Sequence, residues 1–312
     1  MRMWSDAEVA AALDVDVAIS SQRVAFEALA RGEAQLADKV GIRTGDDTAL
    51  SYLCRLSPRH GAVSKIVAVH PGNAGRGLPT ISGTVLVMDP VTGRLVATMQ
   101  AAALTETRTA AGSAVAADAL ALPDADELAI LGSGVQARAH VRAIARVRQL
   151  REVRIFSRDA ARREAAAAEL AAELGLPVRA VASAEEAVRE APLIAACTLS
   201  AEPVVPTAAV AAGATVISVG SFEHHRCEVD AELVRRAGAV VVDEVGAAAA
   251  HAGPIAGALE RGDIARERLR ALGEVLLGAA PGRRDAAEVV FYNSVGLGVQ
   301  DAAAAHAVLG TL

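Results

Sequence analysis

The sequence feature that most constrains the fold is a glycine-rich turn at residues 132–137, which reads Gly-Ser-Gly-Val-Gln-Ala. An apolar run of strand length, 128–131, precedes it, and a stretch of helical character, 138–148, follows directly. Between a strand and a helix this pattern is typical of the first turn of a Rossmann domain, where glycine lets the backbone approach a pyrophosphate at the helix N-terminus. We therefore expect a dinucleotide here, bound by Gly132, Ser133, Gly134, Val135 and Gln136; a turn without a ligand is the alternative.

The rest of the second half repeats a strand-and-helix rhythm. Short apolar runs occur at 128–131, 153–157, 178–181, 193–197, 215–219 and 240–243, and helical segments separate most of them. Strands that alternate with helices predict a parallel, doubly wound sheet. We expect a Rossmann dinucleotide-binding domain over residues 119–296 of an α/β protein.

The first half has a different texture. A Ser-x-x-Glu capping box at Ser5 predicts a helix over 5–13, and a second helix is expected over 16–30. Strands are expected at 64–69, 80–88 and 95–99, with a turn at 89–93, before a helix over 105–120. The tail from residue 292 predicts a glycine turn and a helix that packs back on the first half. Residues 1–118 plus 297–312 are therefore expected to form an α+β substrate-binding and dimerisation domain, with a cleft between the two domains for a small ligand.

Composition excludes several classes of function. The 37 acidic and 31 basic residues are well mixed and give a net charge of −6, so nucleic acid and anionic membranes are not expected partners. The apolar stretches are short or interrupted by charge, and the N-terminus lacks signal-peptide order, which favours a cytoplasmic protein. The 3 cysteines have no CxxC spacing, so we expect reduced thiols and no metal site.

The end of the second expected strand bears on the choice of cofactor. NAD-specific sites usually carry an acidic residue there for the adenosine ribose, whereas this chain reads Ser157-Arg158-Asp159. A hydroxyl and a guanidinium suit a 2′-phosphate, so NADP(H) is the preferred cofactor. In the alternative, Asp159 reaches the ribose and NAD(H) binds, or Arg158 is only a solvated loop charge.

Motifs along nearly the whole chain resemble the ornithine cyclodeaminase/mu-crystallin family in order and spacing. The segments that carry the resemblance are 65–73, 77–80, 104–111, 132–137, 219–221 and 293–296. Members of this family include ornithine and lysine cyclodeaminases, a type of alanine dehydrogenase, and reductases of cyclic ketimines. The resemblance also implies a homodimer formed through the first domain, and we expect the strands around 80–99 to supply an edge for it.

The resemblance assigns roles to individual residues. It implies that Lys65, Arg108 and Arg43 hold a substrate carboxylate, although Arg55 or Arg59 could replace Arg43. Cations gathered in one cleft repel one another unless an anion joins them, and guanidinium grips carboxylate bidentately. Thr80 is expected to face the reacting centre, or to be only a strand residue. The positions implied for cofactor contact are Thr109, Cys197, Thr198, Val219, Gly220 and Ser294.

Two acidic positions of the cyclodeaminases are missing from this chain. Phe222 stands where their catalytic aspartate is expected, and Tyr52 stands on or near the acid that binds the substrate's distal amine. Cyclodeamination needs a base, whereas a protonated cyclic ketimine already attracts hydride. Phe222 is therefore expected to cover an apolar substrate ring, while Glu223, His224 and His225 are either proton donors or exposed loop residues.

These observations predict NADPH-dependent reduction of a small α-imino acid, such as pyrroline-2-carboxylate. The alternatives are an NAD-dependent ornithine cyclodeaminase, an alanine dehydrogenase, or a non-catalytic protein that binds NADP and a small ligand.

Overall fold

The computed structural model describes residues 1–312, apart from the side chain of residue 74. The chain forms two compact units, which are Met1–Thr109 with Leu297–Leu312, and Ala110–Gly296. The chain passes from the first unit to the second within α3 (Ala101–Leu120), between Thr109 and Ala110, whereas the expected boundary follows residue 118. This helix also begins at Ala101 instead of residue 105, because it starts directly where the preceding strand ends.

The first unit contains a seven-stranded sheet. Its middle is an antiparallel meander of β4 (Asp47–Arg55), β5 (Val63–Val69), β6 (Ile81–Met88) and β7 (Leu95–Gln100). At one edge β1 (Arg2–Trp4) runs parallel to β7; at the other, β2 (Gln35–Leu36) and β3 (Val40–Thr44) both pair with β4. The strands expected at 64–69, 80–88 and 95–99 are confirmed, and those within 40–55 were not foreseen.

The position of β6 and β7 corrects one expectation. β6 lies between β5 and β7, and β7 lies between β6 and β1. The strands around 80–99 are therefore inside the sheet, and the expectation that they provide an edge for dimerisation is wrong.

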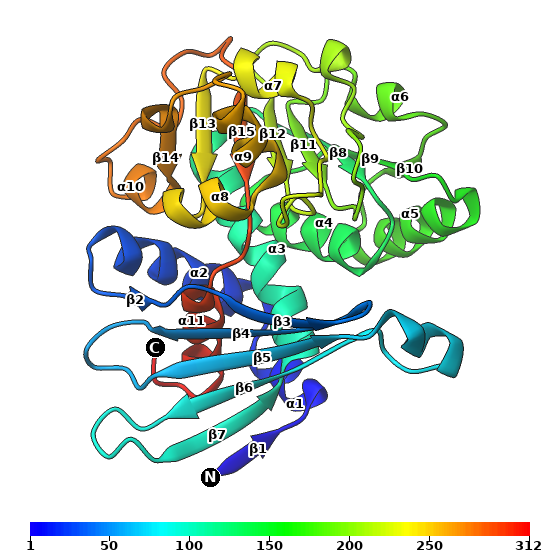
Figure 1. Cartoon of the computed structure of the whole chain (residues 1–312). Helices are drawn as coiled ribbons and strands as arrows, with labels where there is room; N and C mark the ends of the chain where they lie inside the picture. Colours follow the sequence, from blue (N-terminus) through cyan, green and yellow to red (C-terminus); the bar gives the residue numbers. More distant parts are fainter. The chain divides into compact units, whose positions relative to one another are not determined.

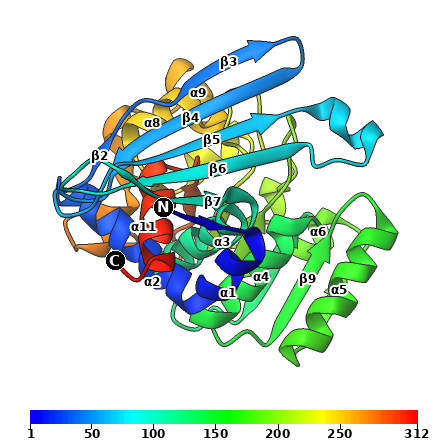
Figure 2. The same ribbon diagram turned by 90° about the horizontal axis from the view of Figure 1, so that it is seen from below.

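Three helices accompany this sheet. They are α1 (Asp6–Ala12), α2 (Val15–Ala30) and α11 (Gly298–Val308). The capping box at Ser5 and Glu8 forms as expected, and Asp14 caps α2. The C-terminal helix α11 packs on α2 and on β4, β5 and β6, so the tail returns to the first unit as predicted (Figures 1 and 2). Its many alanines allow this close approach, and Val63, Val85 and Val87 of the sheet are buried.

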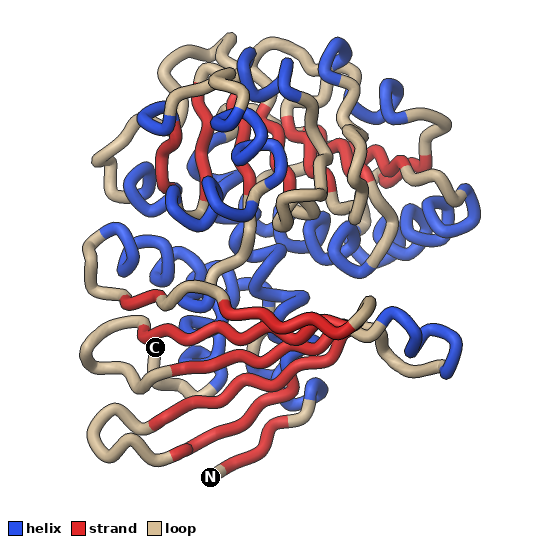
Figure 3. The backbone as a smooth tube through the Cα atoms, viewed as in Figure 1, coloured by secondary structure: helices blue, strands red, loops and turns tan.

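The second unit contains an eight-stranded parallel sheet in the order β10-β9-β8-β11-β12-β15-β13-β14, drawn in red in Figure 3. The strands are β8 (Glu127–Leu131), β9 (Glu152–Phe156), β10 (Val178–Ala180), β11 (Leu193–Ala196), β12 (Thr215–Ser218), β13 (Ala239–Val242), β14 (Leu269–Ala271) and β15 (Val290–Asn293). The chain order reverses between β8 and β11, and ligands of such sheets bind where the order reverses.

The expected doubly wound sheet is therefore confirmed, although two of its strands, β14 and β15, were not among the expected ones. Residues 290–293, of which Tyr292 was assigned to the tail, form β15, inserted between β12 and β13. All four residues of β15 are buried, which is typical of a central strand in a parallel sheet.

The helices of this unit are α4 (Val135–Val147), α5 (Ala160–Leu174), α6 (Ala184–Val188), α7 (Ala231–Arg236), α8 (Val245–His251), α9 (Gly253–Glu260) and α10 (Leu272–Leu276). Their ends follow the expected signals: Asp159 caps α5, which ends at the left-handed Gly175, and Asp230 caps α7. Short 3-10 turns occur at Pro71–Arg76, Thr207–Ala209 and Arg266–Arg268. Among the described residues, no helix is both long enough and apolar enough to cross a membrane.

Candidate functional site

The glycine turn after β8 has the geometry that a dinucleotide site requires. Gly132 has a φ of +121°, and a Cβ atom there would lie 2.6 Å from the carbonyl oxygen of Cys197. Only glycine fits this position, because the strand ends approach so closely. Gly134 differs: it has an ordinary φ of −80° and would carry a Cβ atom into open space.

The start of α4 leaves backbone donors free. Gly134 is its N-cap residue and supplies no side-chain cap. The first amides of a helix have no partner within the helix, and they carry the positive end of its dipole. An anion such as a pyrophosphate is the partner that this arrangement favours.

The ends of β11 and β12 are joined by a buried carboxylate that the sequence did not reveal. Glu228 Oε1 accepts hydrogen bonds from Thr198 N (2.6 Å) and Thr198 Oγ1 (2.8 Å). Its Oε2 accepts from Ser218 Oγ (2.8 Å), Val219 N (3.1 Å) and Gly220 N (2.7 Å). Burial raises the pKa of Glu228, and these hydrogen bonds oppose the rise. The carboxylate thus fixes two strand ends at the carboxyl edge of the sheet.

A second buried carboxylate organises the ends of β13 and β15. Asp243 Oδ2 accepts hydrogen bonds from Gly296 N (2.8 Å), Val295 N (2.9 Å) and Ser294 Oγ (3.2 Å). Burial raises the pKa of Asp243 to about 6. Ser294 is thereby held at the same edge as Gly132 and Gly220, in agreement with the parallel topology. Its predicted contact with the cofactor remains a prediction.

The end of β9 presents a hydroxyl and a free cation. Ser157 Oγ donates to Ser133 Oγ at 2.8 Å, which links this strand end to the glycine turn. Arg158 is exposed, and its guanidinium has no partner among the described residues. Asp159 is occupied differently: its Oδ1 accepts from Arg162 N at 3.0 Å as the cap of α5, and its Oδ2 lies 3.4 Å from Arg162 Nε.

In the first unit, two predicted anion-binding residues meet at a third residue that the sequence analysis missed. Lys65 Nζ lies 2.7 Å from Asp301 Oδ2, and Arg108 Nε lies 2.9 Å from Asp301 Oδ1. The three residues come from β5, α3 and α11, and their exposed fractions are only 3%, 6% and 1%. The anion that was expected to join the two cations is therefore partly supplied by the protein itself.

The environment of Lys65 lowers the pKa of its ammonium to about 8, chiefly through burial. The nearby Asp301 carboxylate opposes this shift, while the positive charge of Arg108 reinforces it. Tyr52 is the residue directly opposite Lys65 on β4, and its ring centroid lies 5.0 Å from Lys65 Nζ. An aromatic ring thus stands beside the lysine at the position where cyclodeaminases are expected to carry an acid.

Other predicted residues do not join this cluster. Arg43 shares the face of the sheet with Lys65, but it pairs with Thr48, four residues along β4 from Tyr52, or about 13 Å. Its side chain is exposed. Thr80 precedes β6 and is exposed. In α3, Thr109 Oγ1 donates to the carbonyl oxygen of Thr105 at 2.6 Å.

The loop after β12 places Phe222 beside a cation. The guanidinium carbon of Arg226 lies 5.1 Å from the centroid of the Phe222 ring, and Arg226 Nε donates to Glu223 Oε2 at 2.7 Å. His224 and His225 are exposed, in agreement with their interpretation as loop residues.

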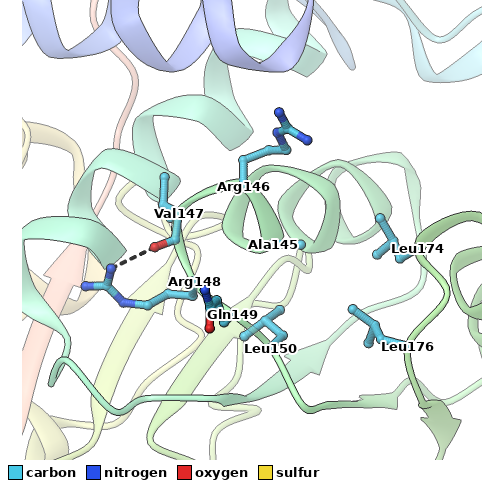
Figure 4. A pocket seen from close by; sticks show the side chains of 8 residues that line it. All are labelled: Ala145, Arg146, Val147, Arg148, Gln149, Leu150, Leu174 and Leu176. Carbon is cyan, nitrogen blue, oxygen red and sulfur yellow. Dashed lines mark hydrogen bonds between the residues drawn. The ribbon is translucent and has the colours of Figure 1, made fainter.

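One surface pocket lies away from the glycine turn. It is lined by residues 145–150 with Leu174 and Leu176, at the C-terminal ends of α4 and α5 (Figure 4). Arg148, on its wall, donates to the carbonyl oxygen of Val147. The glycine turn lies at the other end of α4, so this pocket is not the expected dinucleotide site.

The missed acids gave weak signals in the sequence. Asp301 and Gln300 are the polar residues in the first turn of a helix that is otherwise small and apolar except for His306, and this helix was expected to pack on the first domain. That pattern indicates a buried polar function. Glu228 lies in a loop between exposed-looking charges, where no periodicity distinguishes a buried acid from a solvated one.

Comparisons with known proteins agree with this arrangement. The family model described as "Ornithine cyclodeaminase/mu-crystallin family" matches residues 2–311. The structure of Thermococcus litoralis Delta(1)-pyrroline-2-carboxylate reductase in complex with NADH and L-proline is similar over 100% of this chain and 97% of its own, with a TM-score of 0.94 and 29% identity. An archaeal alanine dehydrogenase dimer with bound NAD has a TM-score of 0.91 at 30% identity, covering 99% of this chain and 95% of its own. The ketimine reductase mu-crystallin of Mus musculus is 34% identical over 245 residues, or 78% of this chain and 74% of that protein.

The Rossmann sheet and its glycine turn are those of a dinucleotide-binding domain, and together with the similar enzymes they place the chain among nicotinamide-dependent enzymes. Within that class, the chain belongs to the ornithine cyclodeaminase/mu-crystallin family.

Proposed function

We propose that the protein is an NADPH-dependent reductase of a small α-imino acid, with a cyclic ketimine such as pyrroline-2-carboxylate as the substrate. The observation that carries the proposal is the buried pair of Lys65 and Arg108, whose two positive charges share one carboxylate. The pair retains one uncompensated positive charge, and the carboxylate of an imino acid matches it.

Hydride transfer sets the remaining requirements. A bound nicotinamide would supply a hydride from C4 to the imine carbon; the hydride's electron pair would form the new C–H bond, and the C=N π electrons would move to nitrogen. A protonated imine becomes a neutral amine, which then takes a proton from solvent. Lys65 and Arg108 would hold the substrate carboxylate, and Gly132, Ser133, Gly134, Val135 and Gln136 would hold the dinucleotide.

The residues at two positions favour reduction over cyclodeamination. Phe222 has no group that could take a proton, and the Arg226 guanidinium, which lies 5.1 Å from the centroid of its ring, is a cation rather than a base. The ring of Tyr52, near Lys65, offers no carboxylate to a distal ammonium. A substrate with a single apolar ring and one carboxylate needs neither a base nor an acid for a distal ammonium, and Phe222 would cover that ring.

NADP(H) is the proposed cofactor. Arg158 is exposed and unpaired, whereas Asp159 is engaged as the cap of α5. Ser157 and Arg158 would then bind the 2′-phosphate, while an NAD-specific site would need a free acid. NAD(H) remains the alternative, since the two similar structures named above contain NADH and NAD.

The remaining predicted contacts extend this proposal. Thr198, Val219 and Gly220, with Cys197, would line the nicotinamide at the carboxyl edge of the sheet. Thr109 and Ser294 would contact the cofactor, Thr80 would face the reacting centre, and Arg43 would assist with the carboxylate after a rearrangement of β3.

We also propose a homodimer formed through the outer face of the first sheet. Val40, Ile42, Leu53 and Ile66 share this face, and their exposed fractions range from 49% to 72%. A contiguous exposed apolar face favours association, and the similar alanine dehydrogenase is a dimer.

The direct test follows oxidation of NADPH and NADH with three substrates: pyrroline-2-carboxylate, pyruvate with ammonia, and ornithine. We expect turnover with the cyclic imine and a higher kcat/KM with NADPH. Lys65→Met should raise KM strongly, whereas Lys39→Met, at the only other lysine of the chain, should not. Ammonia release from ornithine without net cofactor consumption would identify a cyclodeaminase instead, and pyruvate-dependent turnover an alanine dehydrogenase. Binding of NADPH with no turnover on any substrate would identify a non-catalytic binding protein.

A further inference from the structure

The carboxylate of Asp301 contacts both members of the Lys65 and Arg108 pair. Its two oxygens are divided between the cations, at 2.7 Å from Lys65 Nζ and 2.9 Å from Arg108 Nε. Gln300, the preceding residue of α11, accepts from Arg108 Nη1 at 3.4 Å and also from the backbone amide of Leu297 at 2.9 Å. Two residues in the first turn of α11 therefore contact these cations: Asp301 contacts both, and Gln300 contacts Arg108.

Burial makes this contact consequential. Removing a charge from water is costly unless an opposite charge compensates it, and two buried cations also repel each other. One carboxylate between them offsets both effects, yet it leaves the group of three with a single excess positive charge. A ligand with one negative charge completes the balance, whereas a dianion would bring one negative charge too many.

We propose that Asp301 is a positioning and specificity-determining residue of the anion site. It holds the Lys65 ammonium and the Arg108 guanidinium in place, and it limits their net charge so that the site selects monocarboxylates over dicarboxylates. The inference rests on the proposed function for the location of the substrate carboxylate.

The test compares propionate with malonate, which differ by one carboxylate, as ligands of the full-length protein saturated with NADP⁺. Their affinities are obtained from the concentration dependence of the melting temperature. The wild type should prefer propionate. Asp301→Asn, which removes the charge and keeps the shape, should shift the ratio of affinities toward malonate by about tenfold or more.

Two further variants separate charge from packing. Asp301→Glu keeps the charge and lengthens the side chain, so it should weaken both ligands and preserve the wild-type preference. Asp6→Asn removes an acid of the same unit whose Oδ1 accepts from Ala103 N, away from the cluster, and should behave as wild type. An unchanged ratio in a folded Asp301→Asn protein would overturn the proposal.

Asp301→Asn could fail to fold, because it leaves two buried cations without a counter-charge. The double variant Lys65→Met/Asp301→Asn removes one cation and restores the single excess charge. We expect it to fold and to keep the preference for propionate. A double variant that also fails to fold, or that favours malonate, would show that Asp301 acts through something other than this charge balance.

A pH profile gives a readout that a purely structural role would not move. The groups that face Lys65 are Asp301 on α11, Arg108 on α3, and Cys54 and Tyr52 on β4. Of these, the Asp301 carboxylate is the main group that raises the pKa of Lys65 against the effect of burial. In folded Asp301→Asn, propionate binding should therefore be lost at a lower pH than in the wild type. If binding is lost at the same pH in both proteins, the proposal is contradicted.

These measurements do not depend on turnover. If the wild type reduces no imino acid but the ratio shifts as expected, the proposed function is wrong and the role of Asp301 stands. If the wild type reduces an imino acid and the ratio of affinities is unchanged in Asp301→Asn, the proposed function stands and the role of Asp301 is wrong.

Discussion

A Cβ atom placed on Gly220 would lie 1.7 Å from the carbonyl oxygen of Thr198. The ends of β12 and β11 thus touch at this point, and both are held by the carboxylate of Glu228. Three features of this edge, namely the close contact, the shared acid and the neighbouring glycine turn, can each be tested separately.

Gly220→Ala should destabilise the second unit strongly. The added methyl group meets backbone atoms rather than a flexible side chain, so the two strand ends must move apart and the hydrogen bonds to Glu228 weaken. We expect a loss of roughly 2–4 kcal/mol in the free energy of unfolding, measured by urea denaturation. A native-like unfolding curve would show that the strand ends are less constrained than the contact indicates.

Gly134→Ala should weaken cofactor binding and leave the stability nearly unchanged. A methyl group there meets no atom within 4 Å and the backbone has an ordinary φ, so the stability should change by less than about 1 kcal/mol. The dissociation constant of NADPH, measured by fluorescence titration, should rise at least about tenfold because the methyl group would separate the backbone from the pyrophosphate. An unchanged dissociation constant would show that the pyrophosphate does not bind at this turn.

Glu228→Gln should weaken binding of the nicotinamide half of the cofactor and leave binding of the adenosine half unchanged. The amide would keep the shape but present an NH₂ group where backbone amides and hydroxyls now donate, which disturbs Thr198, Val219 and Gly220. We expect weaker binding of NADPH, with the affinity for 2′-phospho-ADP-ribose retained because it lacks the nicotinamide. Equal losses for both ligands would indicate a general structural role.

His140 predicts how stability depends on pH. Its Nδ1 donates to the carbonyl oxygen of Gln136 (2.7 Å), its Nε2 accepts from Ser113 Oγ (2.9 Å), and burial lowers its pKa to about 4. Because the unfolded state takes up the proton first, the contribution of this histidine is complete above pH 6.5 and is lost as the pH falls toward 4. It amounts to roughly 3 kcal/mol.

The variant His140→Gln isolates this contribution. His306, whose pKa is also lowered to about 4, acts with the same sign in both proteins and cancels in the comparison. The difference in unfolding free energy between wild type and variant should shrink between pH 6.5 and pH 4. A difference that stays constant over this range would mean that His140 does not titrate as its burial requires.

Arg158→Ala should reduce the preference for NADPH. Loss of the guanidinium should lower kcat/KM with NADPH by about 10- to 100-fold and leave the value with NADH nearly unchanged. Arg162→Ala serves as a control, because Arg162 is similarly exposed but is paired with Asp159. Equal effects on both cofactors would contradict the assignment of the 2′-phosphate to this strand end.

The Rossmann unit was predictable because its signals are local. Several of its helices follow a short apolar run and begin at a side-chain cap, such as Asp159 or Ser183, and the glycine turn has a recognisable motif. The strand at Val290–Asn293 was not predicted, because a run of four residues is too short to show a periodicity. Its place between β12 and β13 depends on pairing with strands that are distant in the sequence.

The site was only partly predictable for the same reason. Lys65 and Arg108 came from motifs, but Asp301 joins them through contacts across more than 190 residues of sequence, as the 192-residue separation of Arg108 and Gln300 illustrates. The strands that carry Arg43 and Tyr52 mix small, polar and apolar residues, so their alternation was weak. Charge compensation within a buried cluster is a property of the fold rather than of any one segment.

The most direct test of the central claim is the transfer of label from NADPH deuterated on the transferable position of C4 to pyrroline-2-carboxylate, with the proline product analysed by mass spectrometry and NMR. We predict one deuterium at C2 of proline for the wild type, and a rate lowered by at least about 100-fold for Arg108→Leu, with cofactor affinity retained. Proline without deuterium, or an Arg108→Leu enzyme as fast as wild type, would contradict the account.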